Sequence, residues 1–547
     1  MQVMEAVARA LVERGVEHVF GVVGSGNFGI TNALCAAGAR YVAARHECAA
    51  VCMADGYARA SGRPGIVTVH QGPGMSNAAT GLAEAAKSRT PLLLLAADTS
   101  TGAVQSNFRI DQEGLARSLD AVAERLHTPG SALADLDRAW RRALEGRHAV
   151  ALMLPLDVQT AEAPAGFAPP ESTAVSSPAP SEAATAAIAD LVEASSRPAI
   201  VAGRGAVLSE AGARLEVLGD RIGAILATSA NGNGLFSGLP YAVGISGGFA
   251  PPVGAGLLAD ADLVLAFGAS LNMWTTRHGT LIGPETRLVQ VDIDPAAIGR
   301  QRPVDLGVVA DASLAAGALE AELERRGYRS RGYRTPDLAR RIAGGRWRDE
   351  PFEDASTDRT IDPRTLTLSL DDLLPDERTV AVDSGHFMGW PAMYLSVPDP
   401  AGFIFNQSYQ SIGLGLGAAI GAAVARPDRL TVAALGDGGA FMALGELETA
   451  ARLGLRMLIL IYDDAAYGAE VHHFGPRGDP LDIVRFPDTD FAALGRAAGA
   501  GGVTVRTLTD LSAVEDWLEA PDGPLVVDAK VNPTVVAEWL EDAFRAH

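Results

Sequence analysis

The sequence predicts an α/β protein of three domains, each a doubly wound parallel sheet with helices on both faces. Short apolar runs, such as "PLLLLAA" at 91–97 and "RMLILIY" at 456–462, recur along the chain and alternate with helical segments. Continuous apolar runs are typical of parallel strands that are buried on both faces. A chain of 547 residues also exceeds one hydrophobic core and fits roughly three domains of about 150–200 residues.

The first domain is expected over residues 1–160. It begins with an amphipathic helix from residue 3 that ends at Gly15. A second helix starts near residue 45 and runs into a glycine turn. Strands are predicted at 18–23, 65–70, 91–97 and 149–158.

Two connections separate this domain from two further α/β domains. Residues 161–182 have no periodicity and are rich in Pro, Ser and Ala, which predicts a linker. The charge-rich residues 328–360 are a second connection with some helix in it. The central domain, 183–327, has predicted strands at 198–203, 223–228, 262–268 and 287–295. The last domain, 361–547, has predicted strands at 378–385, 430–439, 456–464 and 524–531.

Composition excludes several classes of function. The net charge of −21 and the lack of a basic cluster argue against a nucleic-acid partner. The apolar runs are too short to span a bilayer, so no membrane partner is expected. Only Cys35, Cys48 and Cys52 are present, and nothing resembles a secretory signal. We therefore expect unpaired thiols and a cytoplasmic location.

Four glycine-rich segments follow predicted strands, at 21–27, 70–77, 382–386 and 435–440. Open parallel sheets bind ligands at this carboxyl edge. In the fourth segment, Asp437 lies between two glycines, and Glu446 and Glu448 follow on the next helix. A neighbouring strand ends at Asp464. Two carboxylates beside glycine amides suit Mg²⁺ bridging a diphosphate, although two ordinary helix-capping aspartates would give the same spacing.

Glu47 poses a separate question. The helix that contains it, in "RHECAAVCMADGYARASGRPG" at 45–65, is apolar on nearly every side, which usually means burial. An ionised carboxylate in its first turn is costly unless it has a partner. The composition of the helix alone does not identify that partner.

These segments together carry a family resemblance over almost the whole chain. The segment 45–65, "GPGMSN" at 72–77, and "GDG" at 436–438 with "DDAAYG" at 463–468 resemble thiamine diphosphate-dependent enzymes of the acetolactate synthase, benzoylformate decarboxylase and pyruvate decarboxylase type. The resemblance implies pyrimidine-binding, central Rossmann-like and diphosphate-binding domains in that order. It also implies a homodimer or homotetramer with each site at a subunit interface.

The resemblance assigns a partner to Glu47, namely N1′ of the cofactor's aminopyrimidine. A carboxyl group in an apolar pocket has a raised pKa and can share its proton with a ring nitrogen. By the same analogy Ile412 supports the bent cofactor, and Asp437, Asp464 and the Ala466 carbonyl hold Mg²⁺. The other implied cofactor contacts are Gly72, Pro73, Asn77, His386, Gly436, Gly438, Gly439 and Tyr467. For His386, a surface or capping role is the alternative.

The implied reaction is decarboxylation of a 2-oxo acid and transfer of the acyl carbanion to an aldehyde or ketone acceptor. Ser25 and His70 match catalytic positions of benzoylformate decarboxylase, and Glu470 matches an acid of pyruvate decarboxylase. Gln112 resembles the active-site glutamine of benzaldehyde lyase and acetolactate synthase. Each of the four could instead be structural. Together they would form a polar site able to move protons.

Several departures from the family pattern keep other functions open. Asp111 stands where acetolactate synthases have Phe, and Val23 stands where they have a proline. Pyruvate decarboxylases have paired histidines in the first domain, whereas His472 and His473, the only such pair here, lie late in the chain. The alternatives are a decarboxylase of the benzoylformate type that only protonates, a flavin oxidase of the pyruvate oxidase type, and a non-catalytic scaffold. The segments "AGRGA" and "TTRHG" in the central domain do not clearly indicate a flavin-binding site. Whether FAD is bound is therefore left open, and its absence is favoured.

Overall fold

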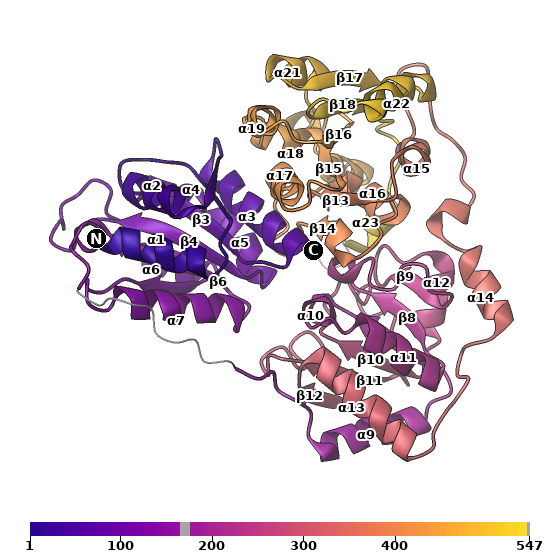
Figure 1. The fold of residues 1–547 in the computed structure, drawn as a ribbon. Helices are drawn as coiled ribbons and strands as arrows, with labels where there is room; N and C mark the ends of the chain where they lie inside the picture. Colours follow the sequence, from indigo (N-terminus) through magenta and orange to yellow (C-terminus); the bar gives the residue numbers. More distant parts are fainter. Residues whose placement is uncertain (165–174, 544–547) are drawn as a thin grey trace.

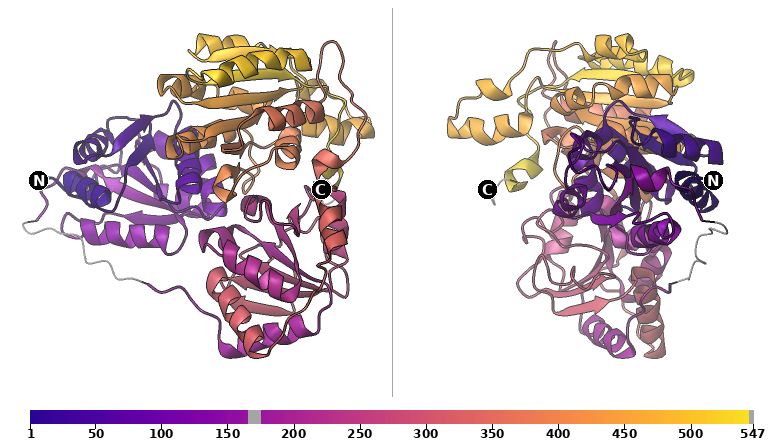
Figure 2. Two further views of the ribbon diagram at one scale, coloured as in Figure 1. Left: turned by 45° about the vertical axis from the view of Figure 1, so that its right-hand side comes forward. Right: turned by 90° about the vertical axis from the view of Figure 1, so that its left-hand side faces the viewer.

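The computed structural model, described over residues 1–164 and 175–543, contains three six-stranded parallel sheets with flanking helices (Figure 1). The predicted fold class is confirmed. In Figures 1 and 2 the first domain lies beside the third, and the central domain lies next to both. Part of the predicted linker 161–182 falls outside the described residues. The second connection contains α14 (Pro336–Ala343), as expected.

The first domain has the strand order β2-β1-β3-β4-β6-β5. Its strands are β1 (His18–Gly21), β2 (Arg40–Ala43), β3 (Gly65–Val69), β4 (Leu92–Asp98), β5 (Val122–Arg125) and β6 (Ala149–Pro155). Its helices are α1 (Val3–Glu13), α2 (Phe28–Ala37), α3 (Glu47–Ser61), α4 (Pro73–Asn77), α5 (Ala79–Lys87), α6 (Gln112–Ser118), α7 (Ala132–Leu144) and α8 (Leu156–Gln159).

The central sheet has the order β12-β11-β10-β7-β8-β9, which is the Rossmann order of a doubly wound sheet. Its strands are β7 (Pro198–Ala202), β8 (Ile225–Thr228), β9 (Ala242–Ile245), β10 (Leu263–Phe267), β11 (Arg287–Asp292) and β12 (Leu306–Val309). Its helices are α9 (Glu182–Glu193), α10 (Arg204–Leu208), α11 (Gly212–Ile222), α12 (Pro252–Ala259) and α13 (Ala312–Arg325).

The third sheet, β14-β13-β15-β16-β18-β17, repeats the strand order of the first. Its strands are β13 (Arg378–Val382), β14 (Phe403–Phe405), β15 (Leu430–Gly436), β16 (Met457–Asp463), β17 (Gly501–Val505) and β18 (Leu525–Lys530). Its helices are α15 (Pro363–Leu373), α16 (Gly389–Tyr394), α17 (Gly415–Ala425), α18 (Asp437–Met442), α19 (Glu446–Arg452), α20 (Gly468–Phe474), α21 (Phe491–Ala497), α22 (Ser512–Glu519) and α23 (Glu538–Ala543).

The strands predicted from the sequence are the interior strands, and the two edge strands of each sheet were not predicted. The strands missed in this way are β2, β5, β9, β12, β14 and β17. Interior strands such as β4 and β16 are buried at every position, which produces the continuous apolar runs. Most of the edge strands are only partly buried, β2 and β12 among them, so their sequences lack that signal.

Helices α3 and α17 join the first and third domains into one hydrophobic core. The two helices occupy equivalent places, each between the second and third strand of its domain. Their backbones touch, because a Cβ atom at Gly421 would overlap the Met53 carbonyl oxygen and one at Gly56 would overlap that of Ala418. Glycine is therefore needed at both crossing points. The central domain has its own core on each face of its sheet.

No helix within the described residues is long and apolar enough to cross a membrane. The three cysteines are unpaired, as expected, with Cys35 exposed and Cys52 buried.

The α3–α17 contact predicts that Gly421→Ala destabilises the protein. The added methyl group must displace backbone, and overpacking of this kind costs about 1–3 kcal/mol. We expect a lower midpoint of thermal unfolding. The matched control is Gly256→Ala on α12, where a Cβ atom meets nothing within 4 Å. That change should leave the midpoint unchanged or raise it, because Ala is the better helix former. Equal midpoints for both variants would contradict the close packing.

Candidate active site

Two aspartates meet at the carboxyl edge of the third sheet. Asp437 is the first residue of α18, directly after β15, and Asp464 follows β16. The two strands are adjacent and parallel, with Gly436 paired to Tyr462. The sheet therefore brings both carboxylates to one edge, as their spacing predicts.

The two carboxylates are held in an unfavourable environment for negative charge. Burial, together with the neighbouring Asp464 and Asp463, raises the pKa of Asp437 to about 8. Burial and Asp463 raise the pKa of Asp464 to about 7. Within the described part of the chain, no cationic side chain pairs with either group. A bound cation would relieve the repulsion between them.

The donor set suits Mg²⁺ better than a softer metal. The described residues contain no group of three or more His, Cys, Asp or Glu side chains that could hold an ion. Two carboxylates and one backbone carbonyl, from Ala466, would leave positions for phosphate oxygens and water, which is the usual coordination of Mg²⁺.

The loop after β16 is shaped by backbone contacts. Ala465 has a left-handed backbone with φ 55°, and its N–H donates to Asp463 Oδ1 at 2.9 Å. Tyr467 donates its N–H to the Val484 carbonyl at 2.9 Å. Lys530 donates to the other oxygen of Asp463 at 2.5 Å. Asp463 thus forms an ion pair with Lys530, whereas no Lys or Arg side chain among the described residues pairs with Asp464.

The glycines beside Asp437 pack so closely against neighbouring side chains that an added Cβ atom would collide with them. A Cβ atom at Gly438 would lie 2.6 Å from the Tyr467 ring, and one at Gly436 would lie 3.0 Å from the Phe387 ring. A Cβ atom at Gly439 would overlap the Asp383 carboxylate. The bare backbone at these positions fits the predicted approach of a diphosphate to peptide N–H groups.

His386 is buried on the same edge, which argues against the alternative of a surface histidine. Its Nε2 accepts the N–H of Ala537 at 2.9 Å, and its ring lies 4.4 Å from that of His472. Burial and His472 lower the pKa of His386 to about 3. The imidazole is therefore neutral with its proton on Nδ1, which leaves Nδ1–H as a donor.

The loop that contains Ile412 is tied to Asp383, a buried residue that was not singled out from the sequence. Its carboxylate accepts the N–H groups of Gly413 and Leu414 at 2.8 and 3.1 Å. Burial raises the pKa of Asp383 to about 6. Asp383 directly follows β13, so its place at a strand end was the available signal.

Glu47 is the first residue of α3 and lies at the domain edge. The helix is buried from Ala49 onward, as predicted, but Glu47 itself is only partly buried in the single chain. The Asn77 amide donates to its carboxylate at 3.0 Å. His46 caps the helix by accepting the N–H of Cys48 at 3.1 Å. Asn77 therefore fixes the orientation of the Glu47 carboxylate, and one side of that carboxylate is left open to solvent.

The structure places Ser25 and His70 in contact. The hydroxyl of Ser25 lies 3.2 Å from His70 Nε2, and His70 Nδ1 lies 2.7 Å from the Gln71 carbonyl. Since only N–H can donate to a carbonyl, Nδ1 holds the proton and Nε2 accepts from Ser25. The exposed Phe108 ring packs edge-on against the His70 ring, with the two ring centroids 4.9 Å apart.

Gln112 is buried behind the second glycine loop. Its carbonyl oxygen accepts the N–H of Gly72 at 2.8 Å, and its amide donates to the Ala97 carbonyl at 3.0 Å. The side chain thus shapes the turn before Pro73, the first residue of α4. Its two contacts support a positioning role, and its predicted catalytic role stays a prediction. Glu470 lies in the first turn of α20, just after the loop that contains Asp464 and Ala466.

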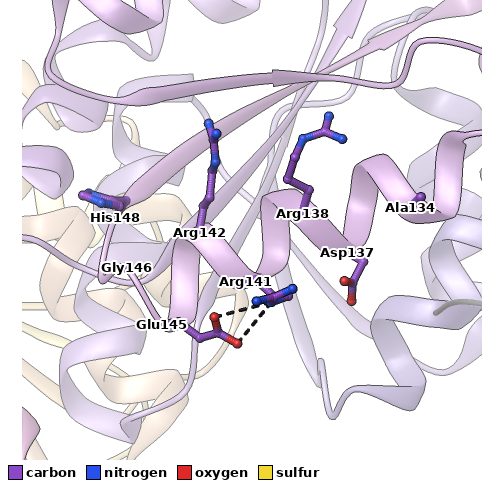
Figure 3. Close-up of a pocket in the computed structure, with 8 residues that line it drawn as sticks. All are labelled: Ala134, Asp137, Arg138, Arg141, Arg142, Glu145, Gly146 and His148. Atoms are coloured by element: carbon purple, nitrogen blue, oxygen red, sulfur yellow. Dashed lines mark hydrogen bonds and ion pairs between the residues drawn. The ribbon is translucent and has the colours of Figure 1, made fainter. Parts of the chain in front are cut away.

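A separate hollow of about 560 Å³ lies over α7, away from these residues (Figure 3). Its arginines are already neutralised. Arg138 and Arg142 pair with Glu124, and Arg141 pairs with Glu145. The hollow therefore offers no free cation for a ligand.

Comparison with known families agrees with the geometry of these sheet edges. The model described as thiamine pyrophosphate enzyme, N-terminal TPP binding domain, matches residues 1–123. The central-domain and C-terminal TPP-binding models of the same family match residues 185–319 and 383–529.

Individual relatives differ in the activity that their names state. An acetolactate synthase large subunit from Parasynechococcus marenigrum is 30% identical over 96% of this chain and 87% of its own. A probable 2-ketoarginine decarboxylase from Pseudomonas aeruginosa is also 30% identical, over 95% and 91%. A sulfoacetaldehyde acetyltransferase from Rhodobacter capsulatus is 28% identical over 100% and 96%. The chain belongs to the thiamine pyrophosphate enzyme family.

Proposed function

We propose that this protein is a thiamine diphosphate- and Mg²⁺-dependent enzyme that decarboxylates a 2-oxo acid and transfers the acyl carbanion to a carbonyl acceptor. The observation that carries the proposal is the pair of carboxylates with raised pKa values, Asp437 (buried) and Asp464 (partly buried), beside the bare glycine backbone at one sheet edge. The cofactor, when bound, supplies the carbon nucleophile that attacks the 2-oxo acid and stabilises the charge left by CO₂.

The residues of the chain divide between holding the cofactor and moving protons. Asp437, Asp464 and the Ala466 carbonyl would hold Mg²⁺, and Gly438 and His386 Nδ1–H would face the diphosphate. Glu47 would hold a proton at the pyrimidine N1′. The hydrogen bond from Asn77 keeps its carboxylate turned in one direction. An oriented acid–base group of this kind typically contributes about 10²–10⁴-fold to the rate.

A simple decarboxylase is the second candidate. Ser25 and His70 form a hydrogen-bonded pair whose Nε2 can pass on the hydroxyl proton. Such a pair could protonate the carbanion and release an aldehyde, or protonate the alkoxide formed when an acceptor is attacked. The relative named as a 2-ketoarginine decarboxylase makes the first outcome chemically reasonable for this family.

A homodimer or homotetramer would complete the site. Apolar side chains flank both cofactor-binding edges and are exposed in the single chain, including Phe28 at 58%, Phe108 at 44%, Phe441 at 47% and Met442 at 64%. Clusters of exposed apolar side chains are typical of interfaces. We propose that Glu47 of one chain and Asp437 of another serve the same cofactor.

The proposed function is tested by incubating the protein with thiamine diphosphate, Mg²⁺ and a panel of 2-oxo acids, with and without aldehydes. We expect CO₂ release that is lost when Mg²⁺ is chelated, and hydroxyketones detected by mass spectrometry. Glu47→Gln should reduce turnover by about 10²–10⁴-fold, because the amide cannot exchange a proton with N1′.

Three results would change the proposal. A Glu47→Gln variant with more than half of the activity would contradict the cofactor assignment. Aldehyde as the sole product would favour the decarboxylase. Flavin absorbance in the purified protein would favour the oxidase and count against the favoured absence of FAD.

His70→Ala separates the two proton-transfer roles. We expect hydroxyketone to fall by about 10²-fold or more and aldehyde to rise, at matched consumption of 2-oxo acid, because the acceptor alkoxide loses its acid. Ser25→Ala should shift the ratio in the same direction by less. A fall in aldehyde would assign His70 to protonation of the carbanion. An unchanged ratio would remove His70 from the mechanism.

A further inference from the structure

Two buried glutamates have no part in the chemistry proposed above. Glu446, at the start of α19, and Glu84, on α5, are each only 1% exposed. A buried carboxylate needs several hydrogen bonds to be tolerated. In both cases two of those bonds come from backbone N–H groups of the other cofactor-binding domain of the same chain.

Glu446 belongs to the third domain but binds the backbone just before the N-terminus of α3 in the first domain. Its Oε1 accepts the backbone N–H groups of Arg45 and His46 at 2.9 and 3.0 Å. Its Oε2 accepts the Thr449 hydroxyl at 2.7 Å, which fixes the carboxylate on its own helix. The two residues that it binds directly precede Glu47.

Glu84 makes the reverse contact. It belongs to the first domain, and its two oxygens accept the N–H groups of Ser408 and Tyr409 of the third, at 3.2 and 2.7 Å. Arg59 pairs with the same carboxylate at 3.2 Å. The bound segment leads into the loop of Ile412, which Asp383 holds from its other end.

The two contacts are equivalent in the repeated topology. Helix α5 lies between the third and fourth strands of the first sheet, and α19 has the same place in the third sheet. Each helix reaches the backbone that precedes the paired helices α3 and α17. Both contacts therefore occur at equivalent positions of the repeated fold.

We propose that Glu446 and Glu84 are reciprocal positioning residues, each fixing the segment with which the opposite domain contacts the cofactor. The inference rests on the proposed function. Glu446 sets the position of Glu47 against the pyrimidine ring, and Glu84 sets the position of the Ile412 loop. A displacement of about 1 Å at such a group can cost about 10²-fold in rate.

The test measures cofactor binding by calorimetry with Mg²⁺ present, using thiamine diphosphate and an analogue in which C–H replaces N1′. In the wild type the analogue should bind about tenfold more weakly, because it cannot bond to Glu47. Glu446→Ala should bring this ratio close to one. Glu446→Asp has a shorter side chain that cannot reach both N–H groups, so it should also bring the ratio close to one. It replaces the alanine variant in the test if that variant does not fold.

Two matched variants isolate the contact. Glu446→Gln keeps an acceptor oxygen for both N–H groups and should restore the wild-type ratio. Glu448→Ala removes the neighbouring carboxylate, which pairs with the Arg45 side chain at the surface and is 35% exposed, and should leave the ratio unchanged. Glu84→Gln should weaken the binding of thiamine diphosphate and of the analogue equally, because the loop that Glu84 positions does not contact N1′.

The outcomes are distinct. A wild type that binds neither compound would overturn the proposed function and this inference with it. A wild type with normal discrimination, together with Glu446 variants that lower the melting temperature but keep the ratio, would overturn the positioning role alone. The positioning role would also be overturned if Glu446→Gln were as impaired as Glu446→Ala.

Discussion

The backbone contact between α3 and α17 is the interaction on which the rest of the structure depends. It requires glycine at Gly56 and Gly421, and it merges the first and third domains into one core. Glu47 starts one helix of this pair, and the Ile412 loop precedes the other. The two segments that we propose contact the cofactor are therefore fixed relative to each other by close packing within a single chain.

The interior of the fold could be predicted from sequence, and its edges could not. Interior strands such as β4 and β16 are continuous apolar runs because both of their faces are covered. Edge strands such as β2 and β12 are short and partly exposed. The repeated strand order of the first and third sheets was equally hidden, because it depends on pairing between distant segments and leaves no short-period repeat.

The candidate site shows a similar division. The strand-end motif located Asp437 and Asp464, because adjacent parallel strands bring such residues to one edge of a sheet. Ser25 and His70 were proposed from the family resemblance. Local sequence could not show that the Gln112 amide is occupied by backbone groups, nor that Glu446 faces the first domain. Those partners lie far away along the chain. Glu446 was visible on the helix after the Asp437 motif, but the sequence assigned it no partner.

The two half-sites of one chain, in the assembly proposed above, serve different cofactors. Co-expression of Glu47→Gln and Asp437→Ala chains tests this claim most directly. Random pairing makes half of the dimers mixed, each with one site free of both lesions, so about one quarter of wild-type activity should return. Each variant alone should stay nearly inactive. No recovery in mixed dimers shown to have formed would contradict the claim, because each site would then be built within one chain.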